Sequence, residues 1–149
     1  MFFKKRNKNQ KGETNTQQID VTLDRVRQAV NEYADGMERG ISLRSIVLDD
    51  HSIDFDLLKG ILKGIPNRPF YMSKETFEIF ETAELPKQID HVQKAVDQYI
   101  QEKGEEPIIP GNPYRKISYY LIGHYLSIEP EVDLYLDSHD KMVTHRCPE

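Results

Sequence analysis

The sequence predicts an α+β fold, in which amphipathic helices pack on an antiparallel sheet that ends in a C-terminal β-hairpin. Residues 21–37 and 86–103 carry apolar side chains at helical spacing, and residues 132–144 alternate apolar and polar side chains as a strand pair does. The chain has 149 residues, of which 38% are hydrophobic, enough for one buried core. We therefore expect a single α+β domain over residues 18–149.

Residues 1–17 differ from the rest of the chain in composition. They hold five cations against one Glu, although the whole chain carries a net charge of -5. The segment is polar and lacks periodicity, so we expect a disordered basic tail. Its first residues can contact an anionic membrane surface weakly, with aromatic rings inserted and cations near lipid phosphates, and a solvated tail is the alternative. The residues of this contact are Phe2, Phe3, Lys4, Lys5 and Arg6.

The first half of the domain is expected to begin with a helix over residues 21–37, where Val26 and Val30 share one face. Residues 41–48 are rich in β-branched side chains and predict a strand. Residues 53–65 have two interpretations, because their alternation fits the second strand of a hairpin while their apolar spacing also fits a helix. We expect a strand that gives way to a short helix.

The middle of the chain is expected to hold a short strand at residues 70–72, followed by a short helix that Ser73 caps. Pro86 stands at the first turn of the longest expected helix, and Gly104 follows its end. Asn112 and the proline after it have the N-cap pattern of another helix. The chain then closes with the alternating segment, which we expect to be a β-hairpin.

Two stretches of the chain resemble two others. VRQAVNEY from Val26 matches VQKAVDQY from Val92, and LDDH from Leu48 matches LDSH from Leu136. An internal duplication would produce a helix and a hairpin twice, with any ligand or partner placed between the halves. The alternative is that VxxAVxxY is the ordinary pattern of an amphipathic helix, and both interpretations stay open.

Polar aromatic side chains crowd the helix expected after Asn112. They offer apolar area with a hydrogen-bonding tip, which suits a pocket or a partner surface, whereas the alternative is a core helix whose tyrosines reach the rim. The residues of this candidate face are Tyr114, Tyr120, His124 and Tyr125.

The final hairpin offers a candidate zinc site. Neutral imidazole and thiolate are zinc ligands, and His139, His145 and Cys147 lie close together in the sequence, with Asp140 beside them. Their spacing matches no established zinc pattern, so the alternative is a polar chain end. We expect no other cofactor.

Composition argues against several classes of function. The acidic balance argues against nucleic-acid binding by the folded body, because phosphate contacts need Lys and Arg in excess. A single Cys suits a reducing compartment, which favours the cytoplasm. No stretch approaches the roughly 20 apolar residues that a membrane-spanning helix needs. The sequence carries no phosphate-binding loop and no nucleophile elbow, so no motif assigns a reaction.

Three strings carry a resemblance along the whole chain: MFFKKR at the start, IPNRPFYMSKETFEIFE in the middle and LYLDSHDKMVTHRCPE at the end. The chain resembles the short, functionally uncharacterised proteins of spore-forming Gram-positive bacteria of the Bacillus type. This resemblance implies a bacterial cytoplasmic protein and assigns no site residue.

The function we expect is that of a non-enzymatic interaction or adaptor domain that uses the tyrosine face to bind a protein partner. A homodimer is compatible with this function, because residues 132–143 can supply an exposed sheet edge. The alternative is a regulatory domain that binds a small ligand or a metal, and an enzyme of unrecognised type ranks third.

Overall fold

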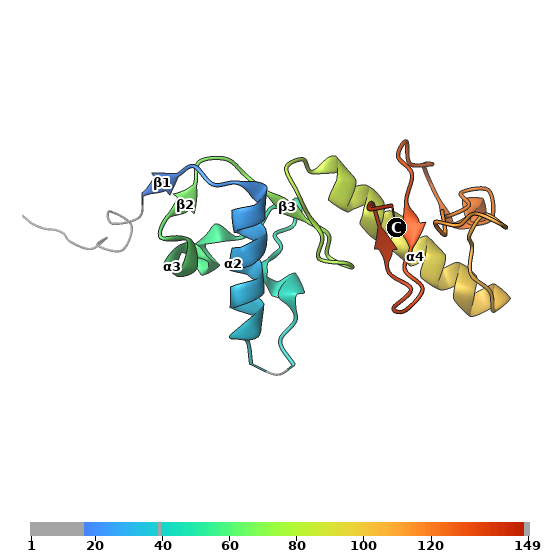
Figure 1. Cartoon of the computed structure of the whole chain (residues 1–149), viewed down its shortest axis with the longest axis horizontal. Helices are drawn as coiled ribbons and strands as arrows, with labels where there is room; N and C mark the ends of the chain where they lie inside the picture. Colours follow the sequence, from blue (N-terminus) through green and yellow to red (C-terminus); the bar gives the residue numbers. More distant parts are fainter. Residues whose placement is uncertain (1–16, 39, 148–149) are drawn as a thin grey trace, which may run out of the picture.

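The computed structural model describes residues 17–38 and 40–147, which form two lobes lying side by side (Figure 1). The first lobe is built around helix α2 (Leu23–Asp35) and the second around helix α4 (Glu84–Lys103). Helices combine with small sheets in both lobes, so the predicted α+β class is confirmed.

Helix α2 lies within the residues predicted for the first helix. It begins at Leu23 because the Thr22 side chain accepts a hydrogen bond from the Arg25 N–H at 3.1 Å, which is an N-cap. Its apolar face, which includes Val26 and Val30, is buried in the first lobe. Strand β1 (Gln18–Ile19) pairs in parallel with β2 (Ile65–Pro66) beside it.

Residues 41–48 differ from the predicted strand, whereas the short helix expected within residues 53–65 is present. The structure has 3₁₀ helices η1 (Leu43–Ile46) and η2 (Phe55–Leu57) there, then the short helix α3 (Lys59–Leu62). Val47 and Ile53 form one antiparallel bridge between the two 3₁₀ helices. The strand over residues 41–48 was therefore a wrong prediction, because Ser42 accepts the Arg44 N–H and starts a helical turn.

The segment after α3 forms a hairpin of β3 (Tyr71–Met72) and β4 (Ile79–Phe80). The predicted helix at Ser73 is wrong. The Ser73 hydroxyl does accept the Thr76 N–H at 2.8 Å, as an N-cap does, but Phe77 then adopts a φ of 65° and turns the chain back into β4. The cap hydrogen bond of Ser73 therefore starts a single turn and not a helix.

The helix predicted at Pro86 is confirmed as α4, which begins two residues earlier, at Glu84. It ends where Gly104, with a φ of 73°, donates its N–H to the Ile100 carbonyl at 2.8 Å. The apolar face of α4 is buried in the second lobe, together with the C-terminal hairpin of β5 (Tyr135–Leu136) and β6 (Val143–Thr144). That predicted hairpin is confirmed.

The helix predicted after Asn112 is wrong. The Asn112 side chain accepts N–H groups from Tyr114 and Lys116, and Arg115 has a φ of 59°, so the chain makes a tight turn. Ile117 then enters a sheet-like pairing with Ile108. The one helical turn found in this region is the 3₁₀ helix η3 (Gly123–Tyr125).

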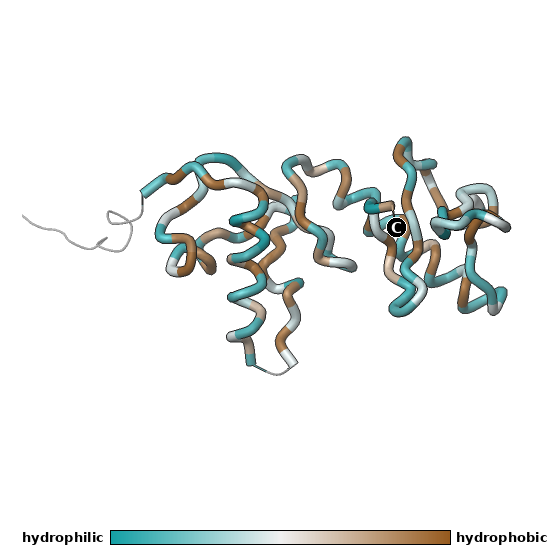
Figure 2. The backbone as a smooth tube through the Cα atoms, in the orientation of Figure 1, coloured by the Kyte–Doolittle hydropathy of each residue, from teal (hydrophilic) through white to brown (hydrophobic). Residues whose placement is uncertain are grey.

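Apolar side chains gather in two clusters, one in each lobe, and not under one continuous sheet. The described residues form three separate two-stranded sheets. One buried cluster runs from Val26 to Ile79 and the other from Phe80 to Val143. Figure 2 shows apolar segments in both lobes. The expected arrangement of helices covering one antiparallel sheet is corrected accordingly.

The two lobes have matching backbone hydrogen bonds at a constant offset along the chain. In the first lobe, Ile53 N–H donates to Phe70 and Met72 N–H donates to His51, at 2.9 and 2.8 Å. In the second lobe, Ile117 N–H donates to Leu134 and Leu136 N–H donates to Arg115, at 2.9 and 3.0 Å.

The matching extends to left-handed residues, which are rare outside glycine. His51 and Arg115 occupy equivalent positions and have φ values of 73° and 59°. Phe77 and Lys141, in the two hairpin turns, have φ values of 65° and 61°. Both turns therefore have the same backbone form.

Candidate functional site

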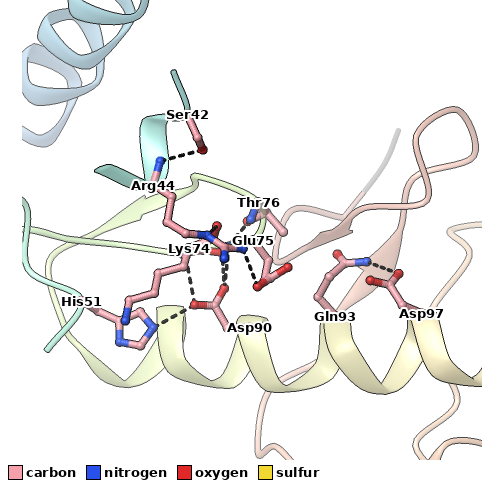
Figure 3. Close-up of polar contacts among 10 residues, drawn as sticks. Ser42, Arg44, His51, Lys74, Glu75, Thr76, Asp90, Gln93 and Asp97 are labelled. Carbon is pink, nitrogen blue, oxygen red and sulfur yellow. Dashed lines mark hydrogen bonds and ion pairs between the residues drawn. The ribbon is translucent and has the colours of Figure 1, made fainter. Parts of the chain in front are cut away.

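Helix α4 carries a buried carboxylate, Asp90, that holds the two lobes together. The carboxylate of Asp90 is almost fully buried and accepts hydrogen bonds from elements of the first lobe (Figure 3). Its donors are Ser73 Oγ at 2.5 Å, the N–H groups of Lys74 and Glu75 at 2.9 and 3.1 Å, and His51 Nε2 at 2.8 Å. One side chain thus fixes the β3–β4 turn and the His51 loop onto α4.

The Asp90 network contains a serine and a histidine, but it does not have the geometry of a nucleophilic relay. Ser73 and His51 each bond to the carboxylate, whereas a relay needs the serine hydroxyl on the imidazole. His51 Nδ1 is buried and has no hydrogen-bond partner among the described residues. The arrangement orders the turn and joins the lobes.

Gln93, one turn further along α4, binds the C-terminal hairpin of β5 and β6. Its Oε1 accepts the Val143 N–H at 2.7 Å, and its Nε2 donates to the Lys141 carbonyl at 3.2 Å and to Asp97 at 3.0 Å. Gln93 is 3% exposed, so these contacts satisfy a buried amide. Figure 3 shows Asp90 and Gln93 leaving the helix on the side of the two hairpins.

Glu78 of the first lobe forms a second link to the C-terminal hairpin. It accepts hydrogen bonds from Thr144 Oγ1 at 2.5 Å and from His145 Nδ1 at 3.2 Å. Burial acts to raise the pKa of Glu78, but the hydrogen bonds from His145 and Thr144 outweigh it, so the pKa lies below its usual value. The His145 ring also packs edge-on against Phe80 at 4.6 Å.

A cavity of about 370 Å³ lies beside this link, between the two hairpins. Thr76 and Glu78 line it from the first lobe, and Asp137, Asp140 and residues 142–147 without His145 line the rest. Backbone N–H groups of His139 and Asp140 lower the pKa of Asp137. The cavity is open to solvent, and its lining combines carboxylates and hydroxyls with the apolar Met142 and Val143.

The three candidate zinc ligands have separate contacts. His145 pairs with Glu78, and exposed Cys147 forms a hydrogen bond with Tyr135 that raises the pKa of this tyrosine. His139 is exposed in the β5–β6 turn. In the part of the chain that the structure describes, no three His, Cys, Asp or Glu side chains are grouped to hold a metal ion.

Three of the four residues of the candidate tyrosine face come together, on a turn and the 3₁₀ helix η3 and not on the long helix that was predicted. Tyr120, His124 and Tyr125 line a hollow of about 260 Å³ with Lys103. Tyr120 is 90% exposed. The Tyr125 hydroxyl donates to Glu102 at 2.5 Å, and this bond raises the pKa of Tyr125. Tyr114 is exposed but does not line this hollow.

A larger groove of about 460 Å³ runs between the first turns of α4 and residues 127–131. We call it the α4 groove. His91 links its two walls, because its Nε2 accepts the Ser127 N–H at 3.1 Å. Ile128 stands at its edge and is 77% exposed. Its lining residues are Glu84, Lys87, Gln88, His91, Ser127, Ile128, Glu129, Pro130 and Glu131.

The residues that join the two lobes and those that line the α4 groove were not predicted from the sequence. Asp90 and Gln93 directly follow the buried Ile89 and Val92 of α4, and polar residues inside an apolar face are a readable signal of a buried contact. Ile128 had no such signal, because an isolated isoleucine in a loop resembles any core residue. The proposed membrane contact of residues 2–6 lies outside the described residues.

The comparisons place the chain by family. A family model described as "Protein of unknown function (DUF3939)" matches residues 16–145, which is most of the chain. No curated protein and no solved structure matches. Among the described residues, no helix combines the length and the apolar character that crossing a membrane requires.

Proposed function

Because the chain belongs to the DUF3939 family of proteins of unknown function, we propose its role from its own surface: a non-enzymatic interaction domain that binds a polypeptide segment in the α4 groove. The observation that carries this proposal is the exposed side chain of Ile128 at the edge of a groove of about 460 Å³. Apolar side chains beside a groove with a charged rim are typical of protein-interaction sites.

The rigid setting of the groove supports the proposal. One wall is α4, whose Asp90 and Gln93 are fixed by buried hydrogen bonds to both hairpins. The other wall is tied to the helix through His91 and Ser127. A preorganised groove binds a partner with less loss of conformational entropy than a flexible one. The hollow lined by Tyr120, His124 and Tyr125, in which Tyr120 is 90% exposed, is the alternative contact surface of the second lobe.

We also propose that the two lobes are one helix–hairpin unit made twice. The matched hydrogen bonds and the matched left-handed residues support this duplication. When VRQAVNEY is aligned with VQKAVDQY, the residues of β1 in the first lobe correspond to the first residues of α4. Amide hydrogen exchange checks the equivalence, since Ile53 and Ile117 should be protected alike, as should Met72 and Leu136. Unequal protection within either pair would count against it.

A cytoplasmic location and a source in spore-forming bacteria belong to the same proposal. The single Cys147, exposed and unpaired with another cysteine, suits a reducing compartment. A homodimer is the simplest assembly compatible with an interaction domain of this size, and sedimentation at increasing concentration measures it.

The test of the proposed function is a selection of binding peptides from a random library. The target is the full chain with residues 2–6 replaced by serine, so that its own basic residues do not compete. Selected peptides should bind at least tenfold more weakly to the same protein carrying Ile128→Ser, and equally well to a control carrying Ile41→Ser. Ile41 is a suitable control because it is also exposed, at 51%, but lies in the first lobe. Selected peptides whose affinity is unchanged by Ile128→Ser would contradict the proposal. A selection that enriches no binding peptide would also contradict it.

A further inference from the structure

The first lobe already holds an extended segment at the position equivalent to the α4 groove. Strand β1 lies along β2, where Ile65 N–H donates to the Gln17 carbonyl at 2.7 Å and Asn67 N–H donates to the Ile19 carbonyl at 2.8 Å. A peptide that adds to a short strand in this way is held by its main chain.

The second lobe has no such strand, because the residues equivalent to β1 form the first turn of α4. Residues 127–131 are the counterpart of residues 63–67, and buried Pro130 matches buried Pro66. The N–H groups of Glu129 and Glu131, equivalent to the two donors in β2, donate to no other described residue. The position that β1 fills in one lobe is therefore an open groove in the other.

The groove also contains an unsatisfied polar atom. Gln88 Oε1 is buried and has no hydrogen-bond partner among the described residues, and Gln88 lines the groove. A buried acceptor without a donor destabilises a folded protein. A bound segment with N–H or ammonium groups would supply that donor.

One difference between the lobes decides how a segment would bind. Gly64 leaves room for β1, since a Cβ there would lie 2.8 Å from the Gln17 carbonyl oxygen. Its counterpart is Ile128, so an incoming segment cannot lie equally close to the backbone. Its apolar side chains would instead pack on the exposed Ile128. The segment therefore needs large apolar side chains.

The charge of the groove defines the rest of the segment. Glu84, Glu129 and Glu131 line it, against one cation, Lys87. An acidic rim around apolar side chains suits a segment with aromatic residues next to cations. Residues 2–6 of this chain, Phe-Phe-Lys-Lys-Arg, have this composition.

We propose that the occupant of the α4 groove is the basic N-terminal segment of this chain, residues 2–6, with its phenylalanines on Ile128 and its cations on the glutamates of the rim. This inference names the segment that the proposed interaction site binds, and so it rests on the proposed function. A groove filled by the chain's own segment is a self-docking device, which an outside partner would have to displace.

The test measures binding of a fluorescein-labelled peptide of residues 1–12 by fluorescence anisotropy. The chain with residues 2–6 replaced by serine should bind the peptide, and the wild-type chain should bind it at least tenfold more weakly because its own segment occupies the groove. Adding Glu129→Lys and Glu131→Lys to the serine variant should weaken binding at least tenfold, and raising the salt concentration should weaken it further. The control Ile41→Ser in the serine variant should leave binding unchanged.

Equal binding by the serine variant with and without the two lysines would overturn the proposal, as would no binding at all. A peptide that binds vesicles of phosphatidylglycerol and phosphatidylcholine but not the protein would assign the segment to a lipid surface. These failures differ from a failure of the proposed function, because library peptides that depend on Ile128 would still bind the groove.

Discussion

Removal of the Asp90 carboxylate should destabilise the protein more than removal of any exposed carboxylate. In Asp90→Ala, the Ser73 hydroxyl and the N–H groups of Lys74 and Glu75 lose their acceptor inside the protein. Leaving buried donors unpaired costs about 1–3 kcal/mol each, and breaking a buried charged network costs about 3–5 kcal/mol, so we expect a loss of about 3–5 kcal/mol. Asp90→Asn keeps one acceptor oxygen and should lose about 2 kcal/mol.

The matched control is Asp24→Ala. Asp24 stands near the start of α2, at the position equivalent to Asp90, but its side chain is 83% exposed and pairs with the neighbouring Arg27. We expect its loss to change the free energy of unfolding by less than about 0.5 kcal/mol. Urea denaturation followed by circular dichroism and by tyrosine fluorescence measures both variants. A change below about 1 kcal/mol for Asp90→Ala would refute the reasoning, because the network would then contribute little to stability.

Three further predictions concern other parts of the fold. Gly64→Ala should lower the free energy of unfolding by about 1–3 kcal/mol, because the new Cβ would lie 2.8 Å from the Gln17 carbonyl oxygen. Gly123→Ala is the control, because a Cβ there would meet open space. Urea denaturation midpoints compare the two variants, and equal midpoints would contradict the β1–β2 packing. Hydrogen bonds from Arg115 and Lys141 lower the pKa of Glu106 from 4.5 to about 2. The contribution of the Glu106 carboxylate to stability is therefore complete above pH 4.5 and is lost as the pH falls towards 2. Glu106→Gln should therefore make stability depend less steeply on pH in that window, and an unchanged slope would count against this ion pair. Zinc in tenfold excess should leave the melting temperature unchanged, and a rise of several degrees would restore the metal-binding alternative.

Elements with a long apolar repeat could be predicted from the sequence. Helices α2 and α4 and the C-terminal hairpin each carry several apolar residues at one period, so a local pattern determined them. The wrong predictions at Ser73 and Asn112 have one physical cause. Both residues form the cap hydrogen bonds that start a helix, but the chain then reaches a left-handed residue, Phe77 or Arg115, and leaves the helical path. No side-chain pattern predicts which residue other than glycine adopts the left-handed conformation.

The candidate site could be predicted only in part, because its residues come from distant parts of the chain. Tyr120, His124 and Tyr125 are neighbours in sequence and do share a hollow. The α4 groove joins a helix to a loop about 40 residues later, and only the folded chain brings Gln88 and Ile128 together. The zinc and membrane hypotheses stay predictions that the experiments above address.

The central claim is that the α4 groove binds a polypeptide segment. Amide chemical-shift mapping with a peptide chosen by library selection tests it most directly. The account predicts shifts at residues 127–131 and in the first two turns of α4, with none at Tyr120 or at the cavity between the hairpins. Shifts confined to either of those other surfaces would contradict it.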